Sequence, residues 1–206
     1  MYARSTTFKD RPQVVDQGIA MVRDEVMPAV QAMDGCVGLS MLVDRVSGSC
    51  VVTSAWETEE ALRASAPLVA PARDRAQQLF GSRPEVRTWE IGVLHRRSAV
   101  ADGACARVTW TRVLPEQMDE HRELFAGHLL PQVEQLPGFE SASMLMDRLT
   151  GHVAIAVVYE SAEALAHNRE AATALRTEAL RRLPTELLDV AEFEVALAHL
   201  RVPETV

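Results

Sequence analysis

The chain contains the stretch Met41-Leu42-Val43-Asp44-Arg45-Val46-Ser47-Gly48, and 103 residues later the related stretch Met144-Leu145-Met146-Asp147-Arg148-Leu149-Thr150-Gly151. In each copy an apolar run is followed by Asp-Arg and by a glycine that precedes a second apolar run. Glycine adopts the positive-φ conformations that a tight turn between two strands requires. The sequence therefore predicts a β-hairpin that occurs twice.

The repeat extends over nearly the whole chain. The same offset relates residues of every class, among them Ala3-Arg4 and Ala106-Arg107, Thr6 and Thr109, Pro12 and Pro115, Pro28 and Pro131, Gly35 and Gly138, and Glu57 and Glu160. Near the end of each copy the offset grows by one, so that Trp89-Glu90 matches Phe193-Glu194. A period near 100 residues is about the size of one small domain. The chain is thus expected to be a tandem duplication.

Composition and charge exclude several classes of function. Of the 206 residues, 48% are apolar and 24% are charged, which is usual for a globular protein. A net charge of -8 argues against a nucleic-acid partner, because phosphate binding needs a basic face. No apolar run is long enough to span a membrane, and no apolar stretch near the N-terminus is typical of a secretory signal. We therefore expect no membrane association.

The three cysteines are Cys36, Cys50 and Cys105, and their spacing is not that of a metal site. Cys36 and Cys50 fall at opposite ends of the expected hairpin, too far apart for a disulfide. We therefore expect a reducing, cytoplasmic location.

Each half has the same expected order of elements. In the first half the pattern predicts a strand over 2–8, a helix from Pro12, hairpin strands over about 36–46 and 49–56, a second helix from Glu57 with Thr58 as N-cap, and a strand over 86–94. Proline cannot donate a helical hydrogen bond, so Pro28 should interrupt the first helix, and Pro67 and Pro71 should break the second. The second half repeats this order from Cys105 to about Ala198.

The order βαββαβ is that of a ferredoxin-like unit and places the chain in the α+β class. We expect one such domain over 1–96 and a second over 104–202, with a polar linker between them. A four-stranded sheet with both helices on one face leaves its other face bare. Two such sheets can cover each other, so the expected fold is a barrel with a pseudo-twofold axis and its helices outside.

The second half carries a recognisable set of turn, cap and core residues. It consists of Leu136-Pro137-Gly138-Phe139, the hairpin with Asp147-Arg148 and Thr150-Gly151, Tyr159-Glu160-Ser161, and Glu163-Ala164-Leu165. This set resembles the antibiotic biosynthesis monooxygenase type of dimeric α/β barrel, and the first half shows the same frame less completely. The resemblance implies a barrel formed here within one chain, as an internal pseudo-dimer. A homodimer of the whole chain stays open.

The family includes quinone-forming oxygenases that need no cofactor, haem-degrading enzymes and members with no assigned reaction. The resemblance therefore implies a cofactor-independent monooxygenase-like protein acting on a small aromatic or polyketide-like molecule. The alternative is a non-catalytic small-molecule-binding or stress-related module. No metal and no bound cofactor are expected.

The haem-degrading branch can be tested at six positions. Its members carry an asparagine on strand one, and a tryptophan and an iron-ligating histidine on helix two. Matching the hairpins places these residues at Thr6 and Thr109, at Ser65 and Asn168, and at Asp74 and Thr177. None of the six holds the required residue, and haem needs an axial ligand. We therefore expect no haem binding of that kind.

In this barrel type the ligand cavity lies within each half, between the sheet and its helices. Arg107 and Thr109 share one face of a strand, and Arg4 repeats the arginine in the first half. A buried arginine could hold a phenolate or carboxylate, and the threonine could orient it. The alternative is an arginine paired with Glu90 or Glu194 across the sheet.

His167 is the best candidate for a general acid or base among the six histidines, and Asn168 and Tyr159 are candidate substrate contacts. An exposed role for His167 and a packing role for Tyr159 are the alternatives. Because the second half combines Arg107 with His167, we expect any working pocket to lie there.

Overall fold

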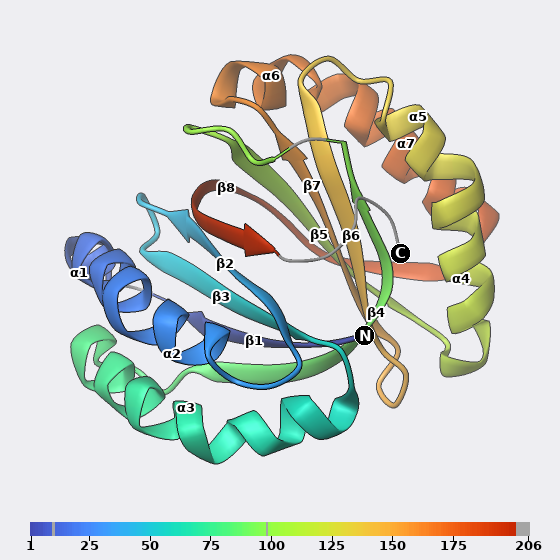
Figure 1. Cartoon of the computed structure of the whole chain (residues 1–206). Coiled ribbons are helices and arrows are strands. Elements are labelled where there is room, and N and C mark those ends of the chain that lie inside the picture. Colours follow the sequence, from blue (N-terminus) through green and yellow to red (C-terminus); the bar gives the residue numbers. More distant parts are fainter. Residues whose placement is uncertain (10, 98, 201–206) are drawn as a thin grey trace. The chain divides into compact units, whose positions relative to one another are not determined.

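The computed structural model describes residues 1–9, 11–97 and 99–200 (Figure 1). The strands are β1 (Tyr2–Phe8), β2 (Cys36–Asp44), β3 (Ser49–Trp56), β4 (Glu85–Arg96), β5 (Cys105–Val113), β6 (Phe139–Asp147), β7 (His152–Tyr159) and β8 (Thr185–Leu200). The helices are α1 (Val15–Met21), α2 (Met27–Gln31), α3 (Glu59–Phe80), α4 (Met118–Leu124), α5 (Leu130–Val133), α6 (Ala162–His167) and α7 (Arg169–Arg182). Each half thus has the expected order, with its first helix divided.

The strands hydrogen-bond in the order β1-β3-β2-β8-β5-β7-β6-β4, which closes as a barrel. The expected fold class, α+β with two βαββαβ repeats, is confirmed. Two compact units can be distinguished, one over residues 1–89 with the end of β8 from Glu194, and one from Glu90 to Phe193. Strands β4 and β8 each contribute residues to both units, and the expected domains over 1–96 and 104–202 stay a prediction.

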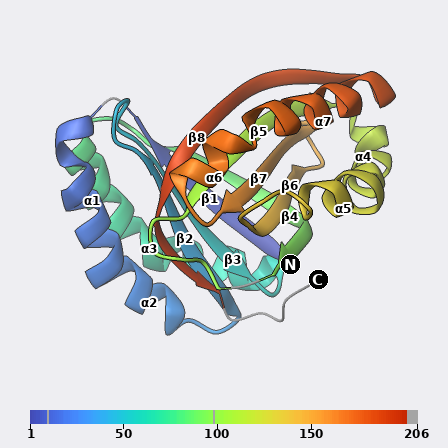
Figure 2. The same ribbon diagram turned by 90° about the horizontal axis from the view of Figure 1, so that it is seen from above.

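In the first unit, helices α1, α2 and α3 lie on one face of the sheet formed by β1, β3 and β2 (Figures 1 and 2). Its core fills the space between the helices and the sheet and includes Val15, Val30, Met41, Trp56, Leu62 and Phe80. The second unit repeats this arrangement, with helices α4 to α7 on β5, β7 and β6. Its core includes Met118, Phe125, Val133, Met144 and Val153.

The two hairpin turns have the same geometry. Gly48 and Gly151 both have φ of +75°. Their N–H groups donate to the carbonyl oxygens of Asp44 (2.8 Å) and Asp147 (2.9 Å). Each aspartate side chain also accepts from the backbone N–H two residues further on. The recurrence of aspartate and glycine is thus explained by the turn.

The arginine of each hairpin ties the turn to other elements. Arg45 forms ion pairs with Asp16 and Glu194, both at 2.7 Å. Arg148 forms the equivalent pairs with Asp119 (2.9 Å) and Glu90 (2.5 Å). Glu90 and Glu194 therefore pair with the hairpin arginines, and the alternative that they pair with Arg4 or Arg107 is wrong.

The first helix of each half is interrupted before its proline. The π-helical segment Val22–Val26 separates α1 from α2, and Phe125–Leu129 separates α4 from α5. Pro28 and Pro131 follow these segments and have no N–H to donate, so the expected interruption is confirmed.

The second helix of the first half is continuous where breaks were expected, and that of the second half is divided where none was expected. Helix α3 runs unbroken from Glu59 to Phe80 with Pro67 and Pro71 inside it, so the predicted breaks are wrong. Its Leu62, Ala76 and Phe80 pack into the core, and packing overrides local propensity.

The second half has no proline there, yet its helix divides at Asn168. The Asn168 side chain donates to the carbonyl oxygens of Pro137 and Ala164. Local side-chain bonds of this kind compete with the helix. The expected N-cap Thr58 accepts a hydrogen bond from the N–H of Ala61 at the start of α3, and Ser161 does the same for Ala164 at the start of α6.

Other expectations can be checked in the same structure. Cys36 pairs with Trp56 and Cys50 with Val43, so the two cysteines lie at opposite ends of the hairpin as expected. In the described part of the chain, no helix combines the length and apolar character needed to span a membrane. The cytoplasmic location stays a prediction.

Replacement of Gly151 by alanine should destabilise the protein more than replacement of Gly103. A Cβ at Gly151 would lie 2.0 Å from the carbonyl oxygen of Val113, whereas a Cβ at Gly103 (φ +84°) meets nothing within 4 Å. Gly103→Ala thus adds only backbone strain, about 1–2 kcal/mol. For a chain of this size that lowers Tm by roughly 2–8 °C. Thermal unfolding should show a larger fall for Gly151→Ala, and equal shifts would contradict the turn geometry.

Candidate functional site

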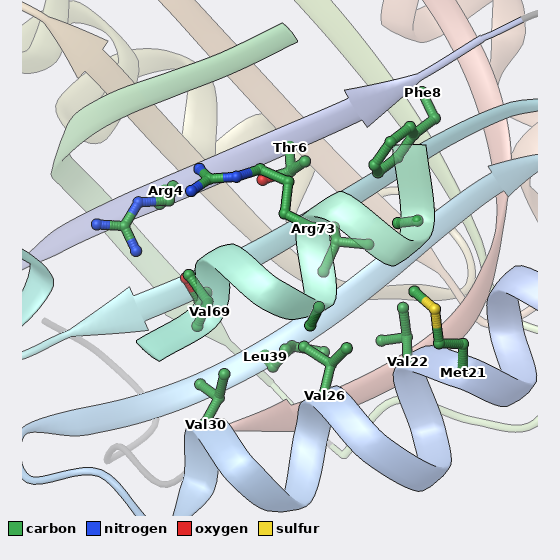
Figure 3. Close-up of a pocket in the computed structure, with 14 residues that line it drawn as sticks. Arg4, Thr6, Phe8, Met21, Val22, Val26, Val30, Leu39, Val69 and Arg73 are labelled. Carbon is green, nitrogen blue, oxygen red and sulfur yellow. The ribbon is translucent and has the colours of Figure 1, made fainter. Parts of the chain in front are cut away.

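A cavity lies in the first unit between the sheet and its helices (Figure 3). Its volume is about 70 Å³, enough for several water molecules. The described residues that line it are mostly apolar: Phe8, Met21, Val22, Val26, Val30, Leu39, Val52, Val69, Ala72 and Ala76, with the polar Arg4, Thr6, Ser54 and Arg73. An apolar cavity with a few convergent polar groups is the usual form of a small-molecule site.

Arg4 reaches from β1 to α3. Its side chain is buried, with 6% of the residue exposed. Nη1 donates to Ser65 Oγ (2.8 Å) and Nη2 donates to the carbonyl oxygen of Leu62 (2.5 Å). Both acceptors are neutral. The guanidinium is therefore held in place without a counter-charge from these partners.

Arg73 extends from α3 toward Arg4 and Thr6 (Figure 3). Burial lowers the pKa of Arg4, and the nearby positive charge of Arg73 lowers it further. Neither arginine forms an ion pair with any described residue of the chain. The cavity therefore carries two positive groups and, among its described lining residues, no acid.

The second unit places Arg107 where the first has Arg4. Arg107 is equally buried, and its Nη2 donates to the carbonyl oxygen of Leu165 (3.1 Å). Unlike Arg4, it forms an ion pair, with Nη2 at 2.8 Å from Glu192 Oε1. Its Nη1 is buried without a hydrogen-bond partner among the described residues. The alternative of an acidic partner thus holds for Arg107, but the partner is Glu192 rather than Glu90 or Glu194.

Arg176 is the second-half equivalent of Arg73, and it lies on α7 near Arg107. Burial lowers the pKa of Arg176, and the charge of Arg107 adds to that effect. Both halves therefore bring an arginine of the second helix close to the arginine of the first strand.

The sequence led us to expect any working pocket in the second half, whereas the cavity described above lies in the first unit. The residues predicted for the second-half site are placed as follows. Thr109 is half-buried on the same strand as Arg107. Tyr159 is buried, which raises its pKa, and the charge of Arg107 opposes that rise. Asn168 is buried, but its amide is used on Pro137 and Ala164. His167 is exposed at the end of α6, outside the buried surroundings of Arg107.

Sequence reasoning missed Arg73, Arg176, Ser65 and Glu192. The signal for the first two was present, because Arg73 and Arg176 repeat at the same offset of 103 as Arg4 and Arg107. The contacts of Ser65 and Glu192 depend on tertiary structure, and no local pattern marks them.

The other five histidines, His199 among them, are not among the described residues that line the cavity. His95 pairs with Glu134, His128 with Glu178, and His152 with Thr150. His121 is buried on α4, which lowers its pKa. Over residues 1–9, 11–97 and 99–200, no group of three or more histidine, cysteine, aspartate or glutamate side chains is arranged to hold a metal ion.

The fold is that of several solved structures. Over all of this chain, a candidate monooxygenase of Fusobacterium nucleatum is similar with a TM-score of 0.75, 12% identity and 96% of its own chain covered. An anthrone oxidase-like protein is similar over 98% of this chain and 94% of its own, with a TM-score of 0.65 and 15% identity. A Listeria monocytogenes ferredoxin-fold protein related to antibiotic biosynthesis monooxygenases gives a TM-score of 0.54 at 8% identity, over 94% of each chain. These similarities establish the fold expected from the sequence.

The sequence has much nearer relatives. No family model matches it. Two proteins of Mycobacterium tuberculosis strain H37Rv, the uncharacterized proteins Rv2557 and Rv2558, are 50% and 51% identical over this entire chain, which covers 92% and 88% of their lengths. The chain therefore belongs to the family of Rv2557 and Rv2558, and it has the antibiotic biosynthesis monooxygenase type of α/β-barrel fold.

Proposed function

We propose that the first-unit cavity binds a small aromatic or polyketide-like molecule as its anion, and that the protein oxygenates this molecule with O₂ and no bound cofactor. The names of two proteins of similar fold, a candidate monooxygenase and an anthrone oxidase-like protein, support the reaction class. Because a fold alone supports many functions, the proposal depends on the cavity.

The observation that carries the proposal is the buried, unneutralised charge of Arg4. Removing a charged group from water is costly unless an opposite charge or strong hydrogen bonds replace the water. Arg4 has two neutral acceptors, and Arg73 adds a second positive charge. A phenolate, enolate or carboxylate in the cavity would supply the missing negative charge through charge-assisted hydrogen bonds.

The same arrangement suits oxygenation of an electron-rich anion. Bound positive groups favour the ionised form of a phenol or enol, so they lower its pKa. The anion can then give electrons to O₂, and the apolar walls limit side reactions with water. For a methylene between two aromatic rings, one O₂ converts CH₂ to C=O and releases one water. Arg4 and Arg73 would hold the anion, and Thr6 would orient its oxygen.

One observation favours the alternative of a non-catalytic binding module. The described residues lining the cavity include no histidine, carboxylate, cysteine or tyrosine. A substrate proton would therefore have to leave through water. A molecule that is already ionised at neutral pH would bind without needing any such step.

Oxygen uptake with anthrone distinguishes these possibilities. If the protein is an oxygenase, wild type should consume one O₂ per anthrone, above the rate without protein. Arg4→Met should lose at least tenfold in rate, whereas Arg107→Met should keep most of it because Arg107 is outside this cavity. Anthrone that binds without O₂ uptake would support the binding module. Rates that fall equally in both variants, or only in Arg107→Met, would contradict the placement of the site.

Replacing the two arginines by methionine should have opposite effects on the stability of the ligand-free protein. Arg4→Met removes a buried charge that has no acidic partner, so Tm should stay unchanged or rise by roughly 2–4 °C. Arg107→Met leaves Glu192 with only Arg169, and should cost about 1–3 kcal/mol. Differential scanning calorimetry of both variants checks this. A fall in Tm for Arg4→Met as large as that for Arg107→Met would show that Arg4 is not an uncompensated charge.

Haemin should not form a stoichiometric complex with the protein. Asp74 is exposed at the position of the iron ligand, and Thr177 donates its hydroxyl to the carbonyl oxygen of Thr173. Neither supplies the nitrogen or sulfur ligand that haem proteins commonly use. Titration followed by absorbance should give a weak, non-saturating change, and a sharp Soret band at one equivalent would refute this.

A further inference from the structure

The two arginine sites differ by one carboxylate. Arg4 and Arg107 occupy equivalent positions, and each lies near an arginine of the second helix. Glu192 pairs with Arg107. The residue equivalent to Glu192 in the first half is Thr88, because Trp89 matches Phe193 in the repeat. The two halves therefore share the arginine but differ in charge at the equivalent positions 88 and 192.

Glu192 holds Arg107 through well-defined contacts. Its Oε1 accepts from Arg107 Nε (3.2 Å) and Nη2 (2.8 Å), and its Oε2 accepts from Arg169 Nη2 (2.7 Å). Burial raises the pKa of Glu192, but the hydrogen bonds from Arg169 and Arg107 outweigh burial and hold it below its usual value. Glu192 is thus ionised near neutral pH and takes the place of an anionic ligand at Arg107.

The first half has neither the carboxylate nor the second arginine that surround Arg107 in the second half. Thr88 is exposed and neutral, and Ala66 stands at the position equivalent to Arg169. Trp89 Nε1 donates to Ser5 Oγ (2.8 Å), so the residues next to Thr88 and Arg4 are in contact. A glutamate at position 88 would therefore be introduced beside the strand that carries Arg4.

We propose that the residue at positions 88 and 192 sets the ligand charge that each half accepts. With Thr88, the first half binds an apolar monoanion at Arg4. With Glu192, the second half rejects anions because its own carboxylate already occupies Arg107. This inference rests on the proposed binding of an anion at Arg4. It identifies Glu192 as a specificity-determining residue and gives the ligand class as a singly charged aromatic acid or phenolate.

The test uses 1-naphthoate and its neutral counterpart 1-naphthamide in isothermal titration calorimetry of the full chain. Wild type should bind one naphthoate per chain and bind naphthamide at least tenfold more weakly. Thr88→Glu should reduce naphthoate affinity at least tenfold, and the uncharged control Thr88→Gln should stay within about threefold of wild type, because only the first adds a negative charge. Thr88→Glu binding naphthoate like wild type would overturn the proposal.

The reciprocal variant tests the second half. Glu192→Ala removes the carboxylate from Arg107 and leaves space for a small anion, so acetate should raise the Tm of Glu192→Ala more than that of wild type or of Glu192→Asp. The absence of an acetate-dependent rise in Glu192→Ala would overturn the role given to Glu192. If wild type itself shows no saturable naphthoate binding, the proposed function fails at Arg4. If wild type binds and the position-88 variants do not differ, only the charge-selection inference fails.

Discussion

In each half, a buried arginine of the first strand donates to a carbonyl oxygen of the second helix, and this bond holds the guanidinium between the sheet and the helix. Arg4 donates to the carbonyl of Leu62, and Arg107 to that of Leu165. Backbone carbonyls are neutral acceptors, so the bond fixes the guanidinium but leaves its charge uncompensated. Arg4 lines the cavity of the first unit, whereas in the second unit Glu192 neutralises Arg107.

The duplication shows how one arrangement can yield two chemical environments. The hairpins, caps and π-helical segments are the same in both halves, because turn and helix geometry require those residues. The surroundings of the arginines are free to change. Ser65 contacts Arg4, whereas the equivalent Asn168 binds Pro137 and Ala164 and divides its helix. Glu192 neutralises Arg107 in the second half, whereas the two hydrogen-bond acceptors of Arg4 described above are both neutral.

Local residue chemistry was enough to predict the fold but only part of the site. The turn with Asp-Arg and glycine and the cap at Thr58 each depend on a few neighbouring residues, so they could be predicted from the sequence. The 103-residue offset showed that the same elements occur twice. The breaks predicted at Pro67 and Pro71 were wrong because core packing keeps α3 continuous. The arginines singled out from the sequence, Arg4 and Arg107, are both buried, and their role in a site stays a prediction. The partner of Arg107 could not be predicted, since β8 brings Glu192 to it only in the folded chain.

Native mass spectrometry of freshly purified protein tests the central claim, that Arg4 holds an apolar anion in the first-unit cavity, most directly. The account predicts a small acidic compound retained on wild type and on Arg107→Met, and lost from Arg4→Met. Retention of the same compound by Arg4→Met, or its loss only from Arg107→Met, would contradict the account.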